Sequence, residues 1–446
     1  MPASDFGLFV LTLAVLLTAV HALGYLAERL KQPRLVGEIL AGVLLGPFVL
    51  KILAPAVSGR LFEFSPQAGS ALGFLYQLGL VLLMFCSGSE TRRLFARDDQ
   101  RRTFVLIGVR VLLCFSLVLG LGFAGLLPLH ALTGPVGQES STLLILAIAV
   151  AVTSIPVISR IFWDLRIMHT RFVGLILGAA VIEDVFLWTV LAIATAMAAT
   201  AAAAHEHLVS AVSRHVANTL IYLTLALLLA PPLLKRLSGA RWNVLYQASP
   251  VGYLMCVLLA FCAVASALEV NLQFAALLAG YAVIGGIHGS ERDRFAVPLD
   301  AIAKVSFGVF VPIYFGVVGY KLVFGSEFSL TLLMVFLLGS TVVSILTGAL
   351  AARLAGFRGL DCVNIALTTN ARGGPGIVLA SVAYEAGIIN ATFYTTLVVT
   401  AVVTSQMAGV WLRYVLSQGW PLLSSHPEET WARGPVTSPS PGRLAT

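Results

Sequence analysis

Thirteen apolar segments follow one another along this chain, and each is long enough to cross a membrane as a helix. They lie near residues 6–26, 35–53, 69–89, 103–127, 142–162, 172–200, 217–234, 250–268, 272–288, 297–320, 328–352, 361–386 and 391–415. The chain is 58% hydrophobic and only 11% charged, so a water-soluble fold would not have enough polar surface to cover it. The sequence therefore predicts an all-α polytopic membrane protein with about thirteen transmembrane helices.

The basic residues between these segments are distributed unevenly. Taken alternately, one set of connections carries seventeen Lys and Arg residues, whereas the other carries only Arg60, Arg214 and Lys321. Because cytoplasmic loops collect Lys and Arg, this bias predicts an N-terminus outside the cell and a C-terminus in the cytoplasm. We expect residues 1–416 to form one multi-pass domain in the lipid bilayer of the inner (plasma) membrane. Residues 417–446, rich in Pro and Ser, are predicted to be a disordered cytoplasmic tail.

Two of the segments are interrupted at mid-membrane depth. In the fifth, Pro156 follows Thr153 and Ser154 and removes a backbone donor. The twelfth combines polar side chains with helix-breaking residues, namely Asn370, Arg372, Gly373, Gly374 and Pro375. Backbone groups freed at that depth must line a cavity or be buried in protein. Each break, taken alone, is equally well explained as an ordinary proline kink.

The positions of the two breaks favour a shared role. If the helix at residues 217–234 is a connector, residues 6–200 and 250–415 form two six-helix halves of opposite topology. The break then lies in the fifth helix of each half. A matched pair of discontinuous helices in inverted repeats is typical of the binding site of a secondary transporter.

Glu183 and Asp184 are adjacent acids in the middle of the apolar segment at residues 172–200. In a helix that starts near Phe172, Asp184 lies roughly 18 Å from the start, close to the centre of a ~30 Å hydrocarbon core. An acid at that depth costs at least ~2.5 kcal/mol on insertion scales, and such residues normally face the protein interior and take part in function. The alternative is a packing defect, or an acid that reaches back to one membrane surface.

The acid pair suggests a specific chemistry. Burial disfavours the charged form of Asp184 and a bound Na⁺ or K⁺ favours it, so a proton and a cation are expected to compete for this carboxylate. Thr153 and Ser154 add oxygen atoms, which hard cations prefer. Adjacent residues on a helix point about 100° apart, so Glu183 is assigned a structural or second-proton role. We expect Arg372 to be its partner, with the capping of helix carbonyls as the alternative role of Arg372.

Other charged residues within the segments are expected to matter less. The side chain of Arg110, near the start of the fourth segment, is expected to extend to the cytoplasmic surface, with pairing inside the protein as the alternative. Asp300 and Lys304 are four residues apart, which predicts an ion pair along one helix face.

Several long motifs resemble a known family. They include LAERLKQPRLVGEILAGVLLGPFVL at residues 26–50, LGLVLLMFCSG at 78–88, TSIPVISRIF at 153–162, FVPIYFGVVGYKL at 310–322 and TTNARGGPGIVLAS at 368–381. Together they resemble the monovalent cation:proton antiporters of the CPA2 type, which exchange Na⁺ or K⁺ for H⁺, with a Kef-like or CHX-like membrane domain. The resemblance implies an NhaA-like antiporter fold, with two discontinuous helices that cross, and a homodimer.

The resemblance also implies roles for single residues. Asp184 matches the ion- and proton-binding aspartate, and Glu183 occupies the preceding place. Thr153 and Ser154 match the unwound stretch of the first broken helix, and Asn370 and Arg372 that of the second. The chain departs from the pattern in two places. Many sodium-transporting members carry a lysine in the eleventh span where residues 342–350 offer only Ser344 and Thr347, and the glutamate that many relatives place after the Ala-Arg-Gly stretch is replaced by Pro375 to Ile377.

The sequence thus predicts a secondary active transporter that exchanges H⁺ for Na⁺ or K⁺ by alternating access. One alternative is a transport-inactive, antiporter-like scaffold or sensor. Another, less favoured, is a membrane-embedded enzyme that uses Glu183 and Asp184 as general acid and base. We find no nucleophile or cofactor pattern, and the five cysteines lack metal-ligand spacing. We therefore expect no enzymatic activity, resident metal, cofactor or nucleic-acid partner.

Overall fold

The computed structural model describes residues 3–30, 32–62, 66–93, 100–154, 158, 161–162, 165–167, 170–201, 208–240, 242–285, 292–324 and 328–424. This part of the chain is helical, and apart from an isolated antiparallel bridge between Thr133 and Ile389 it contains no β structure. The α-helices are α1 Ala3–Arg29, α2 Arg34–Leu45, α3 Leu50–Leu53, α4 Pro55–Phe62, α5 Pro66–Arg93, α6 Gln100–Phe123, α7 Glu139–Ala151, α9 Arg171–Ala201, α10 Leu208–Thr224, α11 Ala230–Gly239, α12 Val244–Ala248, α13 Pro250–Ala267, α14 Leu272–Gly285, α15 Arg292–Val305, α16 Val311–Tyr320, α17 Leu330–Leu354, α18 Leu360–Thr369, α19 Gly373–Glu385 and α20 Ala391–Ser417. Short η segments lie at Leu129–Ala131, Leu225–Leu229 and Ser306–Phe310.

The helices have the length and composition of membrane spans. Within the described residues, nine stretches are long and apolar enough to cross a bilayer, and shorter apolar helices lie at Glu139–Ala151, Phe186–Thr195 and Leu272–Ile284. The prediction of an all-α, multi-pass membrane protein is confirmed. The count of thirteen spans and the inverted-repeat arrangement remain predictions.

Local sequence signals set several helix ends. Ser329 accepts a hydrogen bond from the Leu332 amide at the start of α17, at 3.1 Å, and Asn390 accepts one from the Phe393 amide at the start of α20, at 2.9 Å. Such side chains satisfy amides that have no partner within the helix. The π-helical segment Ser306–Phe310 ends two residues before Pro312, which has no amide hydrogen to donate to the preceding turn. The helix continues from α15 through this segment into α16.

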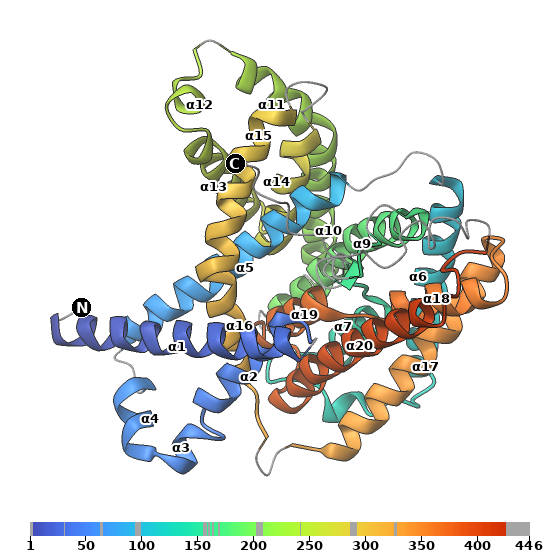
Figure 1. Ribbon diagram of the computed structural model, residues 1–446, viewed down its shortest axis with the longest axis horizontal. Coiled ribbons are helices and arrows are strands. Elements are labelled where there is room, and N and C mark those ends of the chain that lie inside the picture. The colour runs from blue at the N-terminus through green and yellow to red at the C-terminus, as the bar shows by residue number, and fades with distance from the viewer. Residues whose placement is uncertain are drawn as a thin grey trace, which may run out of the picture.

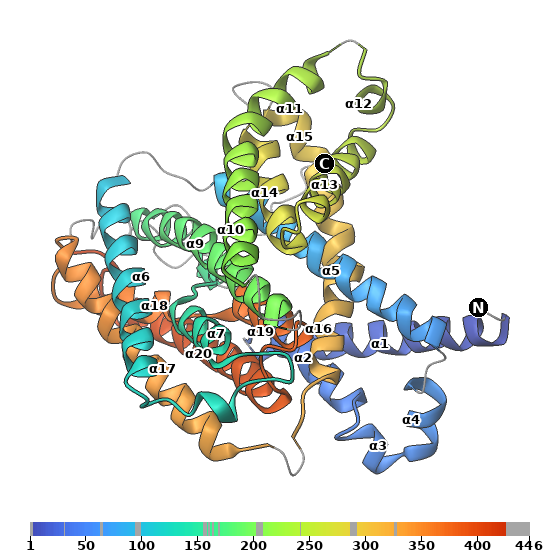
Figure 2. The same ribbon diagram turned by 180° about the vertical axis from the view of Figure 1, so that it is seen from behind.

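The helices form two packed groups, which Figures 1 and 2 show from opposite sides. We call the first the crossing group; it consists of α6, α7, α9, α17, α18, α19 and α20. The second, the scaffold group, consists of α1, α2, α5, α11, α13, α14, α15 and α16. Helix α10 packs on α9 and leads from the crossing group into the scaffold group. Most helix contacts lie within a group, so each group is a candidate rigid unit.

Glycines allow the scaffold helices to approach one another closely. A Cβ atom added to Gly88 of α5 would overlap the carbonyl oxygen of Leu277 in α14, and one added to Gly280 of α14 would overlap that of Phe85. Small residues at such crossings let backbones touch, which replaces the hydrophobic driving force that lipid does not supply. The distance between α5 and α14 is therefore set by contact between their backbones and not by their side chains.

The chain after α20 folds back onto the crossing group. Asp361, in the first turn of α18, accepts hydrogen bonds from the Ser424 amide at 2.9 Å and the Ser424 hydroxyl at 2.6 Å. Leu422 and Leu423 are buried. The chain up to Ser424, which includes the first residues of the predicted tail, is therefore packed against the crossing group. Residues 425–446 lie outside the described part of the chain.

We expect Gly280→Ala to lower the thermal stability of the protein in detergent, because the added methyl group must push α5 and α14 apart. Overpacking of this kind typically costs about 1–3 kcal/mol. Gly108→Ala in α6 is the matched control, since a Cβ atom there meets no other atom within 4 Å. Its melting temperature should stay equal or rise, because alanine favours the helix. Equal melting temperatures for Gly280→Ala and the unmodified protein would contradict the close-contact argument.

Candidate functional site

The two segments in which the sequence predicts a break both belong to the crossing group. Helix α7 ends at Ala151, and Val152 continues in an extended conformation (φ −62°, ψ 138°). Helix α18 ends at Thr369, and α19 starts at Gly373. Gly373 has a positive φ of +34°, which favours glycine. The second break therefore lies where the sequence predicts it, and α7 ends at the start of the first predicted break. Pro156, the predicted cause of the first break, lies outside the described residues.

The two non-helical stretches, residues 152–154 and 370–372, lie side by side and bond to each other. The hydroxyl of Thr153 donates to the carbonyl oxygen of Thr369 at 2.8 Å, and the amide of Ser154 donates to the carbonyl oxygen of Ala371 at 2.7 Å. Both Thr153 and Ser154 are fully buried. Backbone groups freed by the breaks thus find partners across the crossing point, as the low dielectric of a membrane interior requires.

Hydroxyl groups of α20 support the start of α19. The amide of Gly373 donates to Ser405 at 3.0 Å, and the amide of Arg372 donates to Thr404 at 3.4 Å. These amides are among the donors that a helix start leaves without a partner. Gly374 and Pro375 lie in the same first turn, and both are buried. The second break is therefore held from one side by α20.

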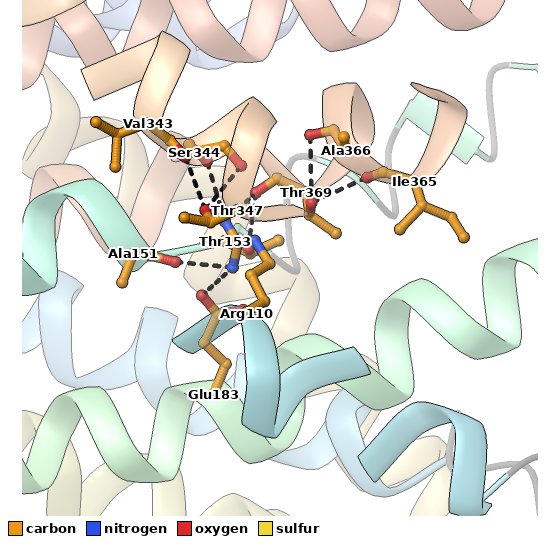
Figure 3. Close-up of polar contacts among 10 residues, drawn as sticks. All are labelled: Arg110, Ala151, Thr153, Glu183, Val343, Ser344, Thr347, Ile365, Ala366 and Thr369. Carbon is orange, nitrogen blue, oxygen red and sulfur yellow. Dashed lines mark hydrogen bonds and ion pairs between the residues drawn. The ribbon is translucent and has the colours of Figure 1, made fainter. Parts of the chain in front are cut away.

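The carboxylate of Glu183 is paired with the guanidinium of Arg110 inside the protein (Figure 3). Nη1 of Arg110 lies 2.6 Å from Oε1 of Glu183 and also donates to the Ala151 carbonyl at 2.9 Å. Nη2 donates to the Thr369 carbonyl at 2.9 Å and to the hydroxyl of Ser344 at 3.2 Å. The side chains of Arg110 and Glu183 are 2% and 3% exposed. One arginine thus connects α6, α7, α9, α17 and α18.

Apolar packing places this ion pair. Ile107 and Val111 of α6 form a buried cluster with Ala179 of α9. Arg110 lies between the two α6 residues in sequence, and Glu183 follows Ala179 by one helical turn. The contact between the two helices therefore brings the cation and the acid together.

The guanidinium also lies at the carboxyl ends of two half-helices. Ala151 is the last residue of α7, and Thr369 is the last residue of α18. Each helix end carries a partial negative charge and carbonyl groups without a partner in the helix, so a cation there is stabilising. Arg110 therefore compensates three negative centres: the Glu183 carboxylate and the ends of both interrupted helices.

Two predictions about arginines are wrong. Arg110 does not extend to a membrane surface, because Glu183 and two helix ends hold it inside. Arg372 is not the partner of Glu183; its Nη1 donates to Ser340 of α17 at 2.7 Å, and its guanidinium carbon lies 5.9 Å from the ring centre of Phe336. The carbonyl-capping role considered for Arg372 belongs to Arg110.

Arg110 and Ser344 are site residues that sequence reasoning missed. The available signal was a count of charges, because the fourth segment carries an arginine and the sixth carries two deep acids. Residues 342–350, where the resemblance leads one to expect a lysine, carry Ser344, and the guanidinium of Arg110 donates to that serine. The positive charge is thus supplied by α6 instead of α17.

The remaining predicted site residues are placed as follows. Asp184 lies in α9 directly after Glu183, and its side chain is outside the described atoms. Asn370 is buried at the second break, and within the described part of the chain neither its amide oxygen nor its amide nitrogen has a hydrogen-bond partner. An unpartnered buried amide oxygen is a ligand that a hard cation can use.

Arg110→Met should destabilise the protein strongly, because Glu183 would be left as an unpaired buried acid. Breaking a buried ion pair from one side typically costs about 3–5 kcal/mol. Lys304→Met is the matched control: its pair with Asp300, at 2.7 Å, has side chains that are 76% and 59% exposed. We expect thermal unfolding in detergent to show a large drop for Arg110→Met and almost none for the control.

A double variant tests the cause of that drop. Removing both charges, as in Arg110→Met with Glu183→Met, should recover part of the lost stability, because no unpaired charge remains buried. A double variant as unstable as the sum of the two single variants would show that the pair does not act as a unit.

Comparisons with known proteins agree with this geometry. Residues 14–418 match the sequence profile of the family described as "Sodium/hydrogen exchanger, transmembrane". The chain is 22% identical to the probable Na⁺/H⁺ antiporter 3 of Methanocaldococcus jannaschii, over 90% of this chain and 95% of that protein. It is 23% identical to the Na⁺/H⁺-K⁺ antiporter GerN of Bacillus cereus, over 91% and 96%.

The fold has a solved counterpart. The structure of the sodium/proton antiporter MjNhaP1 of Methanocaldococcus jannaschii aligns with a TM-score of 0.57 at 15% sequence identity, covering 93% of this chain and 97% of that one. The family profile covers nearly the whole membrane part, including both interrupted helices and the acid pair. The chain therefore belongs to the family of transmembrane sodium/hydrogen exchangers.

Proposed function

We propose that this protein exchanges a monovalent cation, Na⁺ or K⁺, for H⁺ by alternating access across the plasma membrane. The observation that carries the proposal is the crossing of α7 with the α18–α19 break beside the part of α9 that holds Glu183 and Asp184. Family membership supports the same conclusion, as do relatives that are named Na⁺/H⁺ and K⁺/H⁺ antiporters. No observation favours the scaffold or enzyme alternatives.

Asp184 is the proposed exchanging group. A carboxylate out of water is stable only when a proton or a cation neutralises it, and the two ligands exclude each other on one carboxylate. The hydroxyl of Thr153 and the unpartnered amide oxygen of Asn370 are the proposed additional oxygen ligands. Ser154 contributes to the site through its backbone. The protein then carries the proton across the membrane in one direction and the cation in the other, in alternate steps.

The Glu183–Arg110 pair leads us to propose electroneutral, one-to-one exchange. Arginine keeps its proton at any physiological pH, so Arg110 carries the same charge throughout the cycle. We propose that Glu183, bonded at 2.6 Å to that fixed cation, keeps the same charge for as long as the pair stays closed. Asp184 is then the only site acid whose occupant changes. Because H⁺ and a monovalent cation bring equal charge, the charge that moves is the same in both directions.

The two helix groups are the proposed moving parts. The crossing group holds the site and shifts relative to the scaffold group, so that the site faces each side of the membrane in turn. We propose that the scaffold group also forms a homodimer, and that the N-terminus lies outside and the C-terminus in the cytoplasm, as the distribution of basic residues predicts.

Asp184→Asn should abolish exchange, because an amide neither takes up and releases a proton nor carries the negative charge that a proton or a cation neutralises in turn. The measurement is a fluorescent pH signal in inside-out vesicles after addition of Na⁺, K⁺ or Li⁺. Asp300→Asn, which removes an exposed acid far from the site, should leave the signal intact. Exchange at the unmodified rate by a correctly folded Asp184→Asn protein would refute the assignment.

Electroneutral exchange predicts no steady current. Protein reconstituted on a solid-supported membrane should produce no sustained charge movement after a jump in Na⁺ or K⁺ concentration, although a pH dye in matching proteoliposomes reports exchange. An imposed membrane voltage should leave the initial exchange rate unchanged. A sustained current of either sign would contradict the one-to-one ratio while leaving exchange itself supported.

A further inference from the structure

Glu385, the last residue of α19, links the crossing group to two elements of the scaffold group. Its Oε1 accepts a hydrogen bond from Nζ of Lys321, just after α16, at 2.8 Å. Its Oε2 accepts one from Nε2 of Gln77 in α5, also at 2.8 Å. Gln77 in turn accepts from Gln273 of α14 at 3.1 Å. A single carboxylate therefore joins α19 to α5 and to the end of α16.

Aromatic side chains close the space around this link. Nζ of Lys321 lies 4.1 Å from the ring centre of Tyr76, and the rings of Tyr76 and Tyr314 are 5.1 Å apart. The hydroxyl of Tyr314 lies 3.4 Å from that of Ser381 in α19, one turn before Glu385. Tyr76, Tyr314 and Ser381 are at most 2% exposed. The crossing group is thus sealed against the scaffold group along the last turn of α19.

This seal lies at the predicted external end of the molecule. Lys321 is one of the three basic residues in the connections that the basic-residue distribution assigns to the outside. Helix α19 runs from the crossing point at Gly373 to Glu385, so the link lies about 18 Å along the helix from the broken segment. Water from the outside has to pass this layer to reach the site.

We propose that Lys321, Glu385 and Gln77 form the external gate of the transport pathway, and that both bonds of Glu385 break each time the site opens outward. This inference rests on the proposed function, because it assigns a gate to the exchange cycle. The residues are positioning residues: they touch neither the ion nor the proton.

The strength of the link suits a gate. The side chains of Lys321 and Glu385 are 32% and 29% exposed, so water compensates both charges when they separate. Ion pairs of this kind are far weaker than buried pairs such as Arg110–Glu183. Lys321–Glu385 can therefore open in every exchange cycle while Arg110–Glu183 stays closed. The proposed cycle needs one pair that opens and one that does not.

Labelling from the outside tests the gate without measuring transport. In a background whose five cysteines are replaced, Ser381→Cys places one thiol beneath the link, and a membrane-impermeant thiol reagent is added to whole cells. Lys321→Ala or Glu385→Gln should raise the labelling rate about fivefold, which corresponds to the loss of a partly exposed ion pair. The charge swap Lys321→Glu with Glu385→Lys should return it part of the way to the rate of the parent protein, because the ion pair is restored while the bond from Gln77 and the contact with Tyr76 are not.

The matched control is Lys304→Ala, which removes an ion pair within α15 alone and should leave labelling of Ser381→Cys unchanged. Labelling that is equally slow in the parent, Lys321→Ala and Glu385→Gln proteins would overturn the gate. So would faster labelling in the charge-swapped protein than in either single variant.

Cross-linking provides a second, independent measurement. Lys321→Cys with Glu385→Cys, joined by a short bifunctional methanethiosulfonate reagent, should lose exchange and regain it after reduction, whereas each single cysteine variant should stay active. Cross-linked protein that still exchanges at the parent rate would overturn the gate. A parent protein that shows no exchange but the expected labelling changes would instead refute the proposed function and leave the gate standing.

Discussion

The guanidinium of Arg110 is the interaction on which the rest of the site depends. It is buried among the Glu183 carboxylate and the carboxyl ends of α7 and α18, and it contacts all three within 3 Å. Two helices that stop inside a membrane leave carbonyl groups that lipid cannot satisfy. One planar cation with several donors satisfies both ends at once, which a lysine with a single nitrogen does less well.

The two adjacent acids of α9, Glu183 and Asp184, have different roles in our proposal. Because Glu183 is paired with Arg110, we propose the neighbouring Asp184 as the exchanging acid, and the two acids need not perform the same task. The same division appears between the ion pairs. Arg110–Glu183 is buried within the crossing group, whereas Lys321–Glu385 is about one-third exposed and lies between the groups. Burial separates a structural pair from one that can open and close.

Much of this was predictable from local sequence. Apolar segment lengths predicted the membrane helices, and the helix breakers around Gly373 to Gly376 predicted the second discontinuity, which the structure confirms. Arg110 was mispredicted, because its sequence position near the start of a span suggested an exit to the membrane surface. Its true partner is 73 residues away in another helix, and no local pattern reports such a contact. The Arg372 pairing failed for the same reason.

The sequence by itself determined that the chain lies in a membrane, where its helices break and which acids are deep, because these follow from hydrophobicity, proline and glycine chemistry and the high cost of charge in lipid. Only the tertiary structure decided which cation meets which acid, that one arginine serves both broken helices, and that Glu385 joins two helix groups. Those pairings depend on how helices distant in sequence pack, and side-chain packing between helices is a property of the whole fold.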